Sequence, residues 1–214
     1  MNRYPQQMIW LPEDQVVFAG YSITDAGRES DPDGFGAGYV RRIAETMAAR
    51  HPRLRVDVVN RGIGGNTIRD LRERWTNDIL SLRPAWISIM IGINDVWRRL
   101  GCGDAADAVP LEEFAEHYRD LVVSAEGIGS RLMLCETSVI EEDPSSEGNR
   151  LLTGYNDVIR RIAGEHDAVL VEVHREFLRA VEWRPDLQWT TDGVHPTPIG
   201  HALIAEVVLQ TVGA

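Results

Sequence analysis

The sequence predicts an α/β protein, a three-layer α/β/α sandwich whose central five-stranded sheet is parallel. β-rich segments alternate along the chain with segments whose apolar residues recur at helical spacing. Strands that alternate with helices are joined by right-handed crossovers, which place helices on both faces of the sheet. The 214 residues also fit one α/β domain, so we expect a single domain over residues 1–214.

Short runs of Val, Ile, Leu and Met predict the five strands, at residues 16–19, 56–59, 86–91, 132–135 and 169–173. Stretches with apolar residues at helical spacing predict five helices, at residues 39–50, 68–82, 111–126, 151–166 and 199–212. Thr67 and Pro198 are typical of helix starts, and Pro84 of a segment that follows a helix. Gly-, Asp- and Pro-rich composition predicts loops at residues 100–110 and 141–148.

Charge and cysteine content exclude several classes of protein. The 22 basic and 33 acidic residues give a net charge of −11, which predicts that neither nucleic acid nor a membrane surface is a partner. No apolar run approaches the roughly 18 residues of a membrane span, and the first residues lack a signal-peptide pattern, so we expect a cytoplasmic protein. Cys102 and Cys135 are interpreted as reduced thiols. Assembly into a homo-oligomer remains open.

Ligands of an open α/β sheet bind outside the carboxyl ends of the strands, so we expect the functional residues directly after the strands. Ser22 follows the first strand in a tight turn, where it is interpreted as a nucleophile or as a helix N-cap. Residues 60–67, NRGIGGNT, follow the second strand and contain glycines that bring backbone N–H groups close to a ligand. A dinucleotide-binding loop is disfavoured, because Thr67 stands where the third glycine belongs.

Three further polar residues complete this set. Asn94 follows the third strand, where its amide can donate to an anion or form an Asx-turn. Asp192 and His195 are three residues apart, so the carboxylate can hold one ring nitrogen and leave the other free as a base. A metal site is the alternative, although the remaining histidines show no HExxH or clustered spacing. Together these residues supply a nucleophile, a base, its orienting acid and oxyanion donors, which predicts acyl transfer without a metal or organic cofactor.

Four ordered blocks resemble those of the SGNH hydrolases, also called the GDSL family of esterases and lipases: GYSITD, NRGIGGNT, GINDVW and DGVHP. The resemblance extends over nearly the whole chain. Residues 58–71 and 87–99 are most similar to a bacterial subgroup of intracellular acetylxylan esterases. The family implies a flavodoxin-like sheet, Ser22, Asp192 and His195 as the catalytic triad, and Ser22, Gly65 and Asn94 as the oxyanion hole.

The chain departs from the family pattern before the nucleophile, where Tyr21 replaces the usual aspartate. The resemblance implies that this aspartate stabilises the nucleophile turn by hydrogen bonds. If the turn is less well ordered without it, we expect Tyr21→Asp to raise kcat about tenfold, which corresponds to about 1.4 kcal/mol. If the surroundings have adapted to the ring, activity and Tm should instead both fall. A second departure, Gly64 in place of a frequent serine, is a minor one.

Six tryptophans, with Trp97 and Trp189 beside the active blocks, suit stacking on sugar rings, or else packing in the core or at a subunit contact. We therefore expect a serine esterase that removes short acyl groups, above all acetyl, from small carbohydrates such as xylo-oligosaccharides. Trp97, Trp189 and Tyr21 are the candidate substrate-binding residues. A lysophospholipase or acyl-thioesterase is the alternative enzyme, and a catalytically impaired carbohydrate-binding relative is the alternative of a different class.

Overall fold

A computed structural model describes residues 7–101 and 105–214, and its centre is a parallel sheet. The strands lie in the order β2-β1-β3-β4-β5. Their bounds are β1 Gln15–Gly20, β2 Asp57–Gly62, β3 Trp86–Met90, β4 Arg131–Cys135 and β5 Val169–Val171. The predicted five-stranded parallel sheet is therefore confirmed, with strand bounds that differ from the prediction by no more than three residues.

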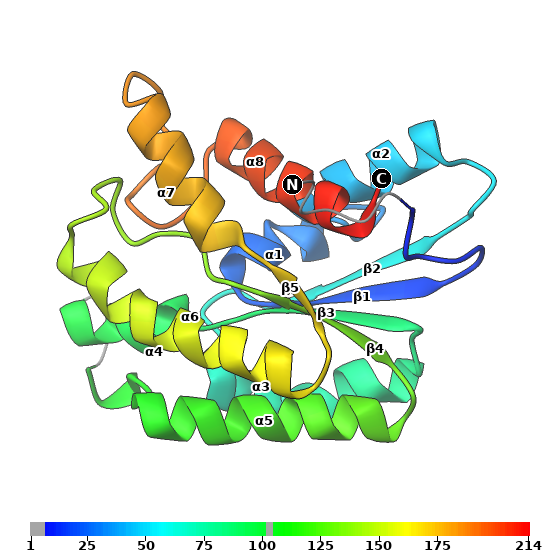
Figure 1. Ribbon diagram of the computed structural model, residues 1–214, viewed down its shortest axis with the longest axis horizontal. Coiled ribbons are helices and arrows are strands. Elements are labelled where there is room, and N and C mark those ends of the chain that lie inside the picture. Colours follow the sequence, from blue (N-terminus) through cyan, green and yellow to red (C-terminus); the bar gives the residue numbers. More distant parts are fainter. Residues whose placement is uncertain (1–6, 102–104) are drawn as a thin grey trace.

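Helices cover both faces of the sheet and complete the predicted three layers (Figure 1). The helices on the upper face in that view are α1 Ser22–Asp25, α2 Tyr39–Arg50, α7 Val173–Trp183 and α8 Pro198–Val212. Those on the lower face are α3 Ile68–Arg74, α4 Ile93–Trp97, α5 Leu111–Gly127 and α6 Glu147–Glu165. No helix in the described part of the chain has the length and apolar character needed to cross a membrane.

Strand position in the sheet explains the apolar patterns in the sequence. Every residue of the central strand β3 is buried, because both of its faces are covered by helices. The edge strand β2 instead alternates buried and more exposed residues. Cys135, at the end of β4, is a free thiol whose burial raises its pKa to about 12, and Cys102 lies outside the described residues.

Three helix predictions need correction. The predicted helix over residues 68–82 is regular only as far as Arg74, and a π segment and a 3₁₀ turn follow it. Helix α6 begins at Glu147, inside the predicted 141–148 loop, because Ser146 accepts a hydrogen bond from the N–H of Asn149 and so caps the helix. Helix α7 is missing from the prediction, although Val173, Phe177 and Val181 recur at helical spacing and are buried.

The two helix starts predicted at Thr67 and Pro198 are both capped by threonine side chains in the structure. Thr67 and Asp70 form a reciprocal capping box at the start of α3. Thr197 caps α8, in which Pro198 occupies the first turn. Both caps lie at the carboxyl end of the sheet, so they fix the helices that follow the oxyanion block and the DGVHP block.

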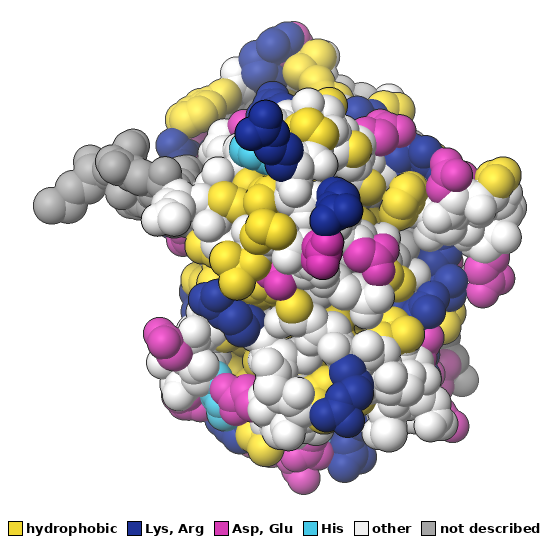
Figure 2. Space-filling view, turned by 90° about the vertical axis from the view of Figure 1, so that its right-hand side faces the viewer, with side chains coloured by type: hydrophobic (Ala, Val, Ile, Leu, Met, Phe, Trp, Pro, Cys, Tyr) yellow, Lys and Arg dark blue, Asp and Glu magenta, His cyan; other side chains and the backbone are white. Residues whose placement is uncertain are grey.

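The strand order reverses between β1 and β3, which makes the crevice outside their carboxyl ends the expected binding place in this topology. Figure 2 shows the opposite end of the molecule, at the amino-terminal ends of the strands, where acidic, basic and hydrophobic side chains are interspersed. The four sequence blocks all follow strands or precede a helix at the carboxyl end. The candidate site is therefore expected at that end.

Candidate active site

Ser22 lies immediately after β1, on the turn that begins α1. This turn is tight: a Cβ on Gly20 would lie 2.3 Å from Thr24 Oγ1 and 2.6 Å from the carbonyl oxygen of Met90. The N–H groups of Thr24 and Asp25 donate to the carbonyl of Tyr21, at 3.0 and 2.9 Å. The backbone thus closes the turn by itself and presents the partly exposed Ser22 to the crevice.

His195 and Asp192 lie in a loop before α8, which we call the 190–196 loop. Ser22 Oγ is 2.8 Å from His195 Nε2, and His195 Nδ1 is 2.7 Å from Asp192 Oδ2. Burial opposes ionisation of Asp192, but the backbone N–H and ring of His195 and the N–H of Val194 outweigh it and lower the pKa of that carboxyl. A carboxylate, an imidazole and a hydroxyl therefore form one hydrogen-bonded chain, through which a proton can leave Ser22.

The other predicted donors surround this chain. The N–H groups of Ser22 and Gly65 have no acceptor within the described residues, so both are free to donate to a substrate oxygen. Asn94 is buried, and its amide donates to the carbonyl of Asn66 at 2.9 Å, which leaves its second N–H available. A Cβ on Gly64 would lie 4.0 Å from the Cβ of Ser22, so the glycine loop runs directly beside the hydroxyl.

Three side chains that the sequence analysis did not single out hold the glycine loop in place. Asp25 accepts from the N–H of Gly64 at 3.0 Å. Arg74 donates to Asn66 Oδ1 at 2.8 Å and to the carbonyl of Gly20 at 3.1 Å, so it joins the loop to the end of β1. Arg98 donates to the carbonyl of Gly65 at 2.8 Å. Asp25 lies within the GYSITD block, which is the one local signal that could have identified it.

Tyr21 does not line the crevice, and this interpretation of the residue is corrected. Its side chain is completely buried, and its hydroxyl lies beside the hydroxyl and backbone of Ser138. Burial raises the pKa of Tyr21 far above its ordinary value, and Ser138 offsets only part of the shift. Asp95, close enough to raise it further, is itself buried, and burial raises the pKa of its carboxyl to about 7. The ring is part of the core beneath the turn.

The two candidate tryptophans lie in different surroundings. Trp97 is partly exposed and packs edge-to-face with His195, with ring centroids 6.0 Å apart. Trp189 is buried against Phe177, and its indole N–H donates to the carbonyl of Arg184 at 3.1 Å. Its expected place on a sugar-binding surface is therefore wrong, because both its face and its polar edge are occupied by the protein. Of the two candidates, Trp97 is the one that contacts His195.

The residues around Asp192 and His195 do not support the alternative of a metal site. No group of three or more His, Cys, Asp or Glu side chains that could hold a metal ion is found in residues 7–101 and 105–214. His201 on α8 is near enough for the charge of His195 to affect it, yet burial, helped by Arg42 and His195, lowers its pKa to about 4. His201 is therefore neutral at neutral pH, and its buried Nδ1 has no partner among the described residues.

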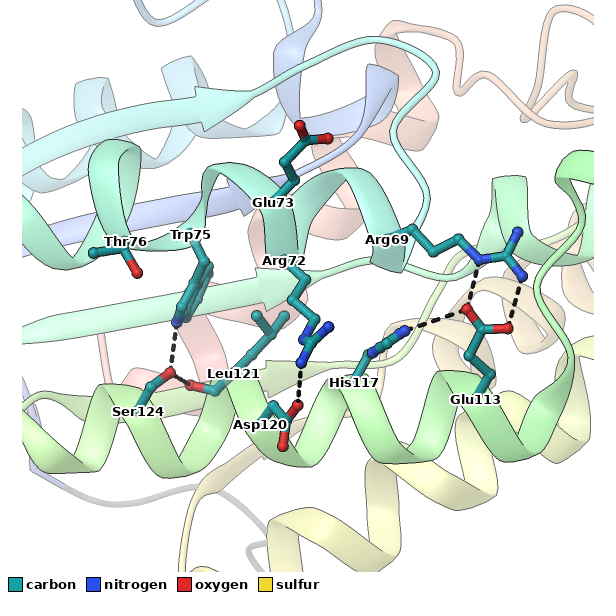
Figure 3. Close-up of a pocket in the computed structure, with 10 residues that line it drawn as sticks. All are labelled: Arg69, Arg72, Glu73, Trp75, Thr76, Glu113, His117, Asp120, Leu121 and Ser124. Atoms are coloured by element: carbon teal, nitrogen blue, oxygen red, sulfur yellow. Dashed lines mark hydrogen bonds and ion pairs between the residues drawn. The ribbon is translucent and has the colours of Figure 1, made fainter.

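A groove of about 660 Å³ lies between α3 and α5, away from the triad (Figure 3). Its polar groups bind one another. Arg69 forms two hydrogen bonds with Glu113, Arg72 pairs with Asp120 at 3.0 Å, and the Trp75 indole donates to Ser124. Because these charges neutralise each other across the two helices, the groove is interpreted as helix packing.

Comparison with known proteins shows the family to which the chain belongs. The model of the GDSL-like lipase/acylhydrolase family matches residues 18–203. An acetylxylan esterase from Geobacillus stearothermophilus is 34% identical over 207 residues, which cover 94% of each chain. The chain therefore belongs to the GDSL-like lipase/acylhydrolase family, and it is an ester hydrolase.

Solved structures extend the similarity to the whole fold. The acetylxylan esterase Axe2 from Geobacillus stearothermophilus superposes with a TM-score of 0.89 at 34% identity, covering 97% of each chain. LAE5, described as an α/β hydrolase from the metagenome of Lake Arreo, has a TM-score of 0.89 at 34% identity and covers 97% of this chain and 98% of its own. The predicted resemblance to this family is thus confirmed.

Proposed function

We propose that this protein is a serine esterase that removes acetyl groups from short xylo-oligosaccharides. The observation that carries the proposal is the hydrogen-bonded chain from Ser22 through His195 to Asp192, with distances of 2.8 and 2.7 Å, at the switch point of the sheet. The 34% identity to an acetylxylan esterase supports the choice of substrate. The same geometry supports the roles proposed below.

In this reaction His195 Nε2 accepts the proton of Ser22 as Oγ attacks the carbonyl carbon of the ester. Asp192 stabilises the resulting imidazolium through Nδ1 and keeps the ring in the required tautomer. His195 then gives the proton to the leaving sugar oxygen, and an acetyl-enzyme remains on Ser22. Water attacks this intermediate by the same steps, so acetate leaves and the free hydroxyl of Ser22 returns.

The negative charge that develops on the carbonyl oxygen is stabilised by the N–H groups of Ser22 and Gly65 and by the amide of Asn94. Donors that are already held in place cost little reorganisation when the charge appears. The contacts of Asp25, Arg74 and Arg98 hold the glycine loop and so supply this preorganisation. Preorganisation of the glycine loop therefore does not depend on the aspartate that usually precedes the nucleophile in this family.

Two further observations support the assignment of roles and substrate. Structures of Axe2 described as catalytic mutants carry alanine in place of a serine, an aspartate or a histidine, and that aspartate and histidine are three positions apart. Asp192 and His195 have the same spacing. The side chains of His195 and Asp192 are 38% and 46% exposed, so the site is open enough for a hydrated sugar chain, and Trp97 offers a ring at its edge.

Activity on acetylated xylo-oligosaccharides, p-nitrophenyl acetate and p-nitrophenyl octanoate, each compared with Ser22→Ala, tests the proposal. We expect acetyl esters to react fastest and Ser22→Ala to be inactive on all three. Trp97→Ala should raise KM for the oligosaccharide more than for p-nitrophenyl acetate. Faster turnover of octanoate would favour a lysophospholipase or thioesterase, and no turnover of any ester would favour an impaired carbohydrate-binding protein.

A cytoplasmic location and the absence of nucleic-acid binding stay predictions, supported by the buried free thiol of Cys135 and by the net charge of −11. Assembly into a homo-oligomer likewise stays open. Cell fractionation, a DNA-binding assay and light scattering test these three points separately.

A further inference from the structure

We propose that Glu142 is a positioning residue that sets the place of the 190–196 loop, and with it the distance between His195 and Ser22. Its carboxyl oxygen Oε1 accepts hydrogen bonds from the N–H of Trp189 at 3.0 Å, from the N–H of Thr190 at 2.6 Å and from the hydroxyl of Thr190 at 2.7 Å. The inference rests on the proposed catalytic triad and names a residue outside it.

The 190–196 loop is closed by its own contacts. Thr190 and Pro196 form an antiparallel bridge at its base, and the N–H of Thr191 donates to the carbonyl of His195 at 2.7 Å. Asp192 Oδ1 accepts the N–H groups of Val194 and His195 at 3.0 and 2.8 Å. The pairing of Asp192 with His195 is therefore internal to the loop and needs no outside support.

The bond between His195 and Ser22 is different, because it joins residues 173 positions apart that lie on separate elements. This hydrogen bond therefore depends on the position of the whole 190–196 loop relative to Ser22. Glu142 binds the base of the loop at Thr190, and the N–H of Glu141 donates to the carbonyl of Gly193 at its tip, at 2.6 Å. Two contacts at opposite ends of the loop fix both its position and its tilt.

The segment that carries Glu142 is itself rigidly attached to α6. The amide of Asn149 donates to the carbonyls of Glu141 and Asp143, at 3.1 and 2.7 Å, and accepts the N–H of Ile140 at 2.9 Å. Asn149 is buried, so this attachment is protected from water. Residues 141–148, which the sequence presents only as an acidic loop, thus connect a core helix to the loop that bears the base.

The test compares Glu142→Ala with Glu141→Ala. The side chain of Glu141 is exposed and makes no hydrogen bond within the described residues, so it is a matched control in the same segment. Glu142→Gln is the conservative variant, because its amide oxygen can accept the same three donors. Measurements are kcat and KM on p-nitrophenyl acetate, the rate of Ser22 labelling by a fluorophosphonate, and the low-field proton NMR signal of the His195–Asp192 hydrogen bond.

A misplacement of about 1 Å costs about a hundredfold in rate, and the buried Val194 still holds the loop near its place. We therefore expect Glu142→Ala to lower kcat and the labelling rate about tenfold, with KM nearly unchanged and the low-field signal retained. Glu142→Gln should restore most of both rates. The selective loss of the serine-histidine step, with the histidine-aspartate signal intact, is a result that general unfolding would not produce.

Two results would overturn the inference. The first is that the rates for Glu142→Ala equal those for Glu141→Ala. The second is that Glu142→Ala loses both the low-field NMR signal and the circular dichroism signal of the folded protein at the assay temperature, because general unfolding would then explain the lower rates. Ser22→Ala separates this outcome from failure of the proposed function. If Ser22→Ala stays active, the serine mechanism itself is wrong. If it is inactive while Glu142→Ala equals the control, only the positioning role of Glu142 is wrong.

Discussion

Replacing Tyr21 with aspartate restores the residue usual in the family, and in this protein we expect it to lower both stability and activity. The ring of Tyr21 is completely buried, so the shorter side chain leaves a cavity. Truncating a buried aromatic residue costs about 3 to 5 kcal/mol. The new carboxyl would also stand near Asp95, whose own pKa is raised to about 7 by burial. Burying a second carboxyl there adds to the loss.

For a chain of this length each kcal/mol lowers Tm by about 2 to 4 °C, so we expect a decrease of about 10 °C in Tm. No gain in kcat is expected, because the turn before Ser22 is closed by backbone hydrogen bonds to the carbonyl of Tyr21 and the glycine loop is held by Asp25 and Arg74. The two variables are Tm from calorimetry and kcat on p-nitrophenyl acetate at 25 °C, where the variant is still folded.

Tyr21→Phe is the matched control. Phenylalanine keeps the buried ring and removes only the hydroxyl that lies beside Ser138, so Tm and kcat should change far less than in Tyr21→Asp. A Tyr21→Asp protein with higher kcat and an unchanged Tm would refute this reasoning. It would show that the turn lacks a brace and that the pocket around the ring can accept a carboxylate.

Other outcomes follow from the site. His195→Ala should remove nearly all turnover, as Ser22→Ala does, and a loss smaller than about tenfold would contradict the triad. Asn94→Ala should lower kcat by about 10² to 10³ with little change in KM, since an oxyanion donor acts on charge present only in the transition state; a change in KM alone would make Asn94 a substrate-binding residue. The raised pKa of Asp95 means that the folded protein holds a proton which the unfolded chain loses near pH 4. Stability should therefore fall as pH rises from about 4 to about 7, and melting curves of Asp95→Asn should lack this component. EDTA should leave the rate unchanged, and restoration by zinc after a loss would indicate a metal site at Asp192 and His195.

Much of the fold could be predicted from the sequence because its signals are local. Buried parallel strands read as short apolar runs, and α2 follows its helical spacing from Tyr39 to Arg50. The positions of Ser22, Asn94 and the Asp192–His195 pair follow as well, since the carboxyl ends of parallel strands must meet at one edge. Helix α7 was not predicted, because its apolar spacing begins at Val173, the last residue of the predicted strand.

The sequence by itself thus determined the layers of the fold, the family and the edge of the sheet at which Ser22, Asp192 and His195 meet. The direction of each side chain at that edge was decided only by the tertiary structure. Tyr21 lies inside the GYSITD block and Trp189 just before the DGVHP block, but both side chains are buried in the core, because elements distant in sequence provide apolar space there. Glu142 is 48 residues from Thr190, and no local pattern marks their contact. A hydrogen bond between distant loops depends on how the helices pack, and packing is a property of the whole chain.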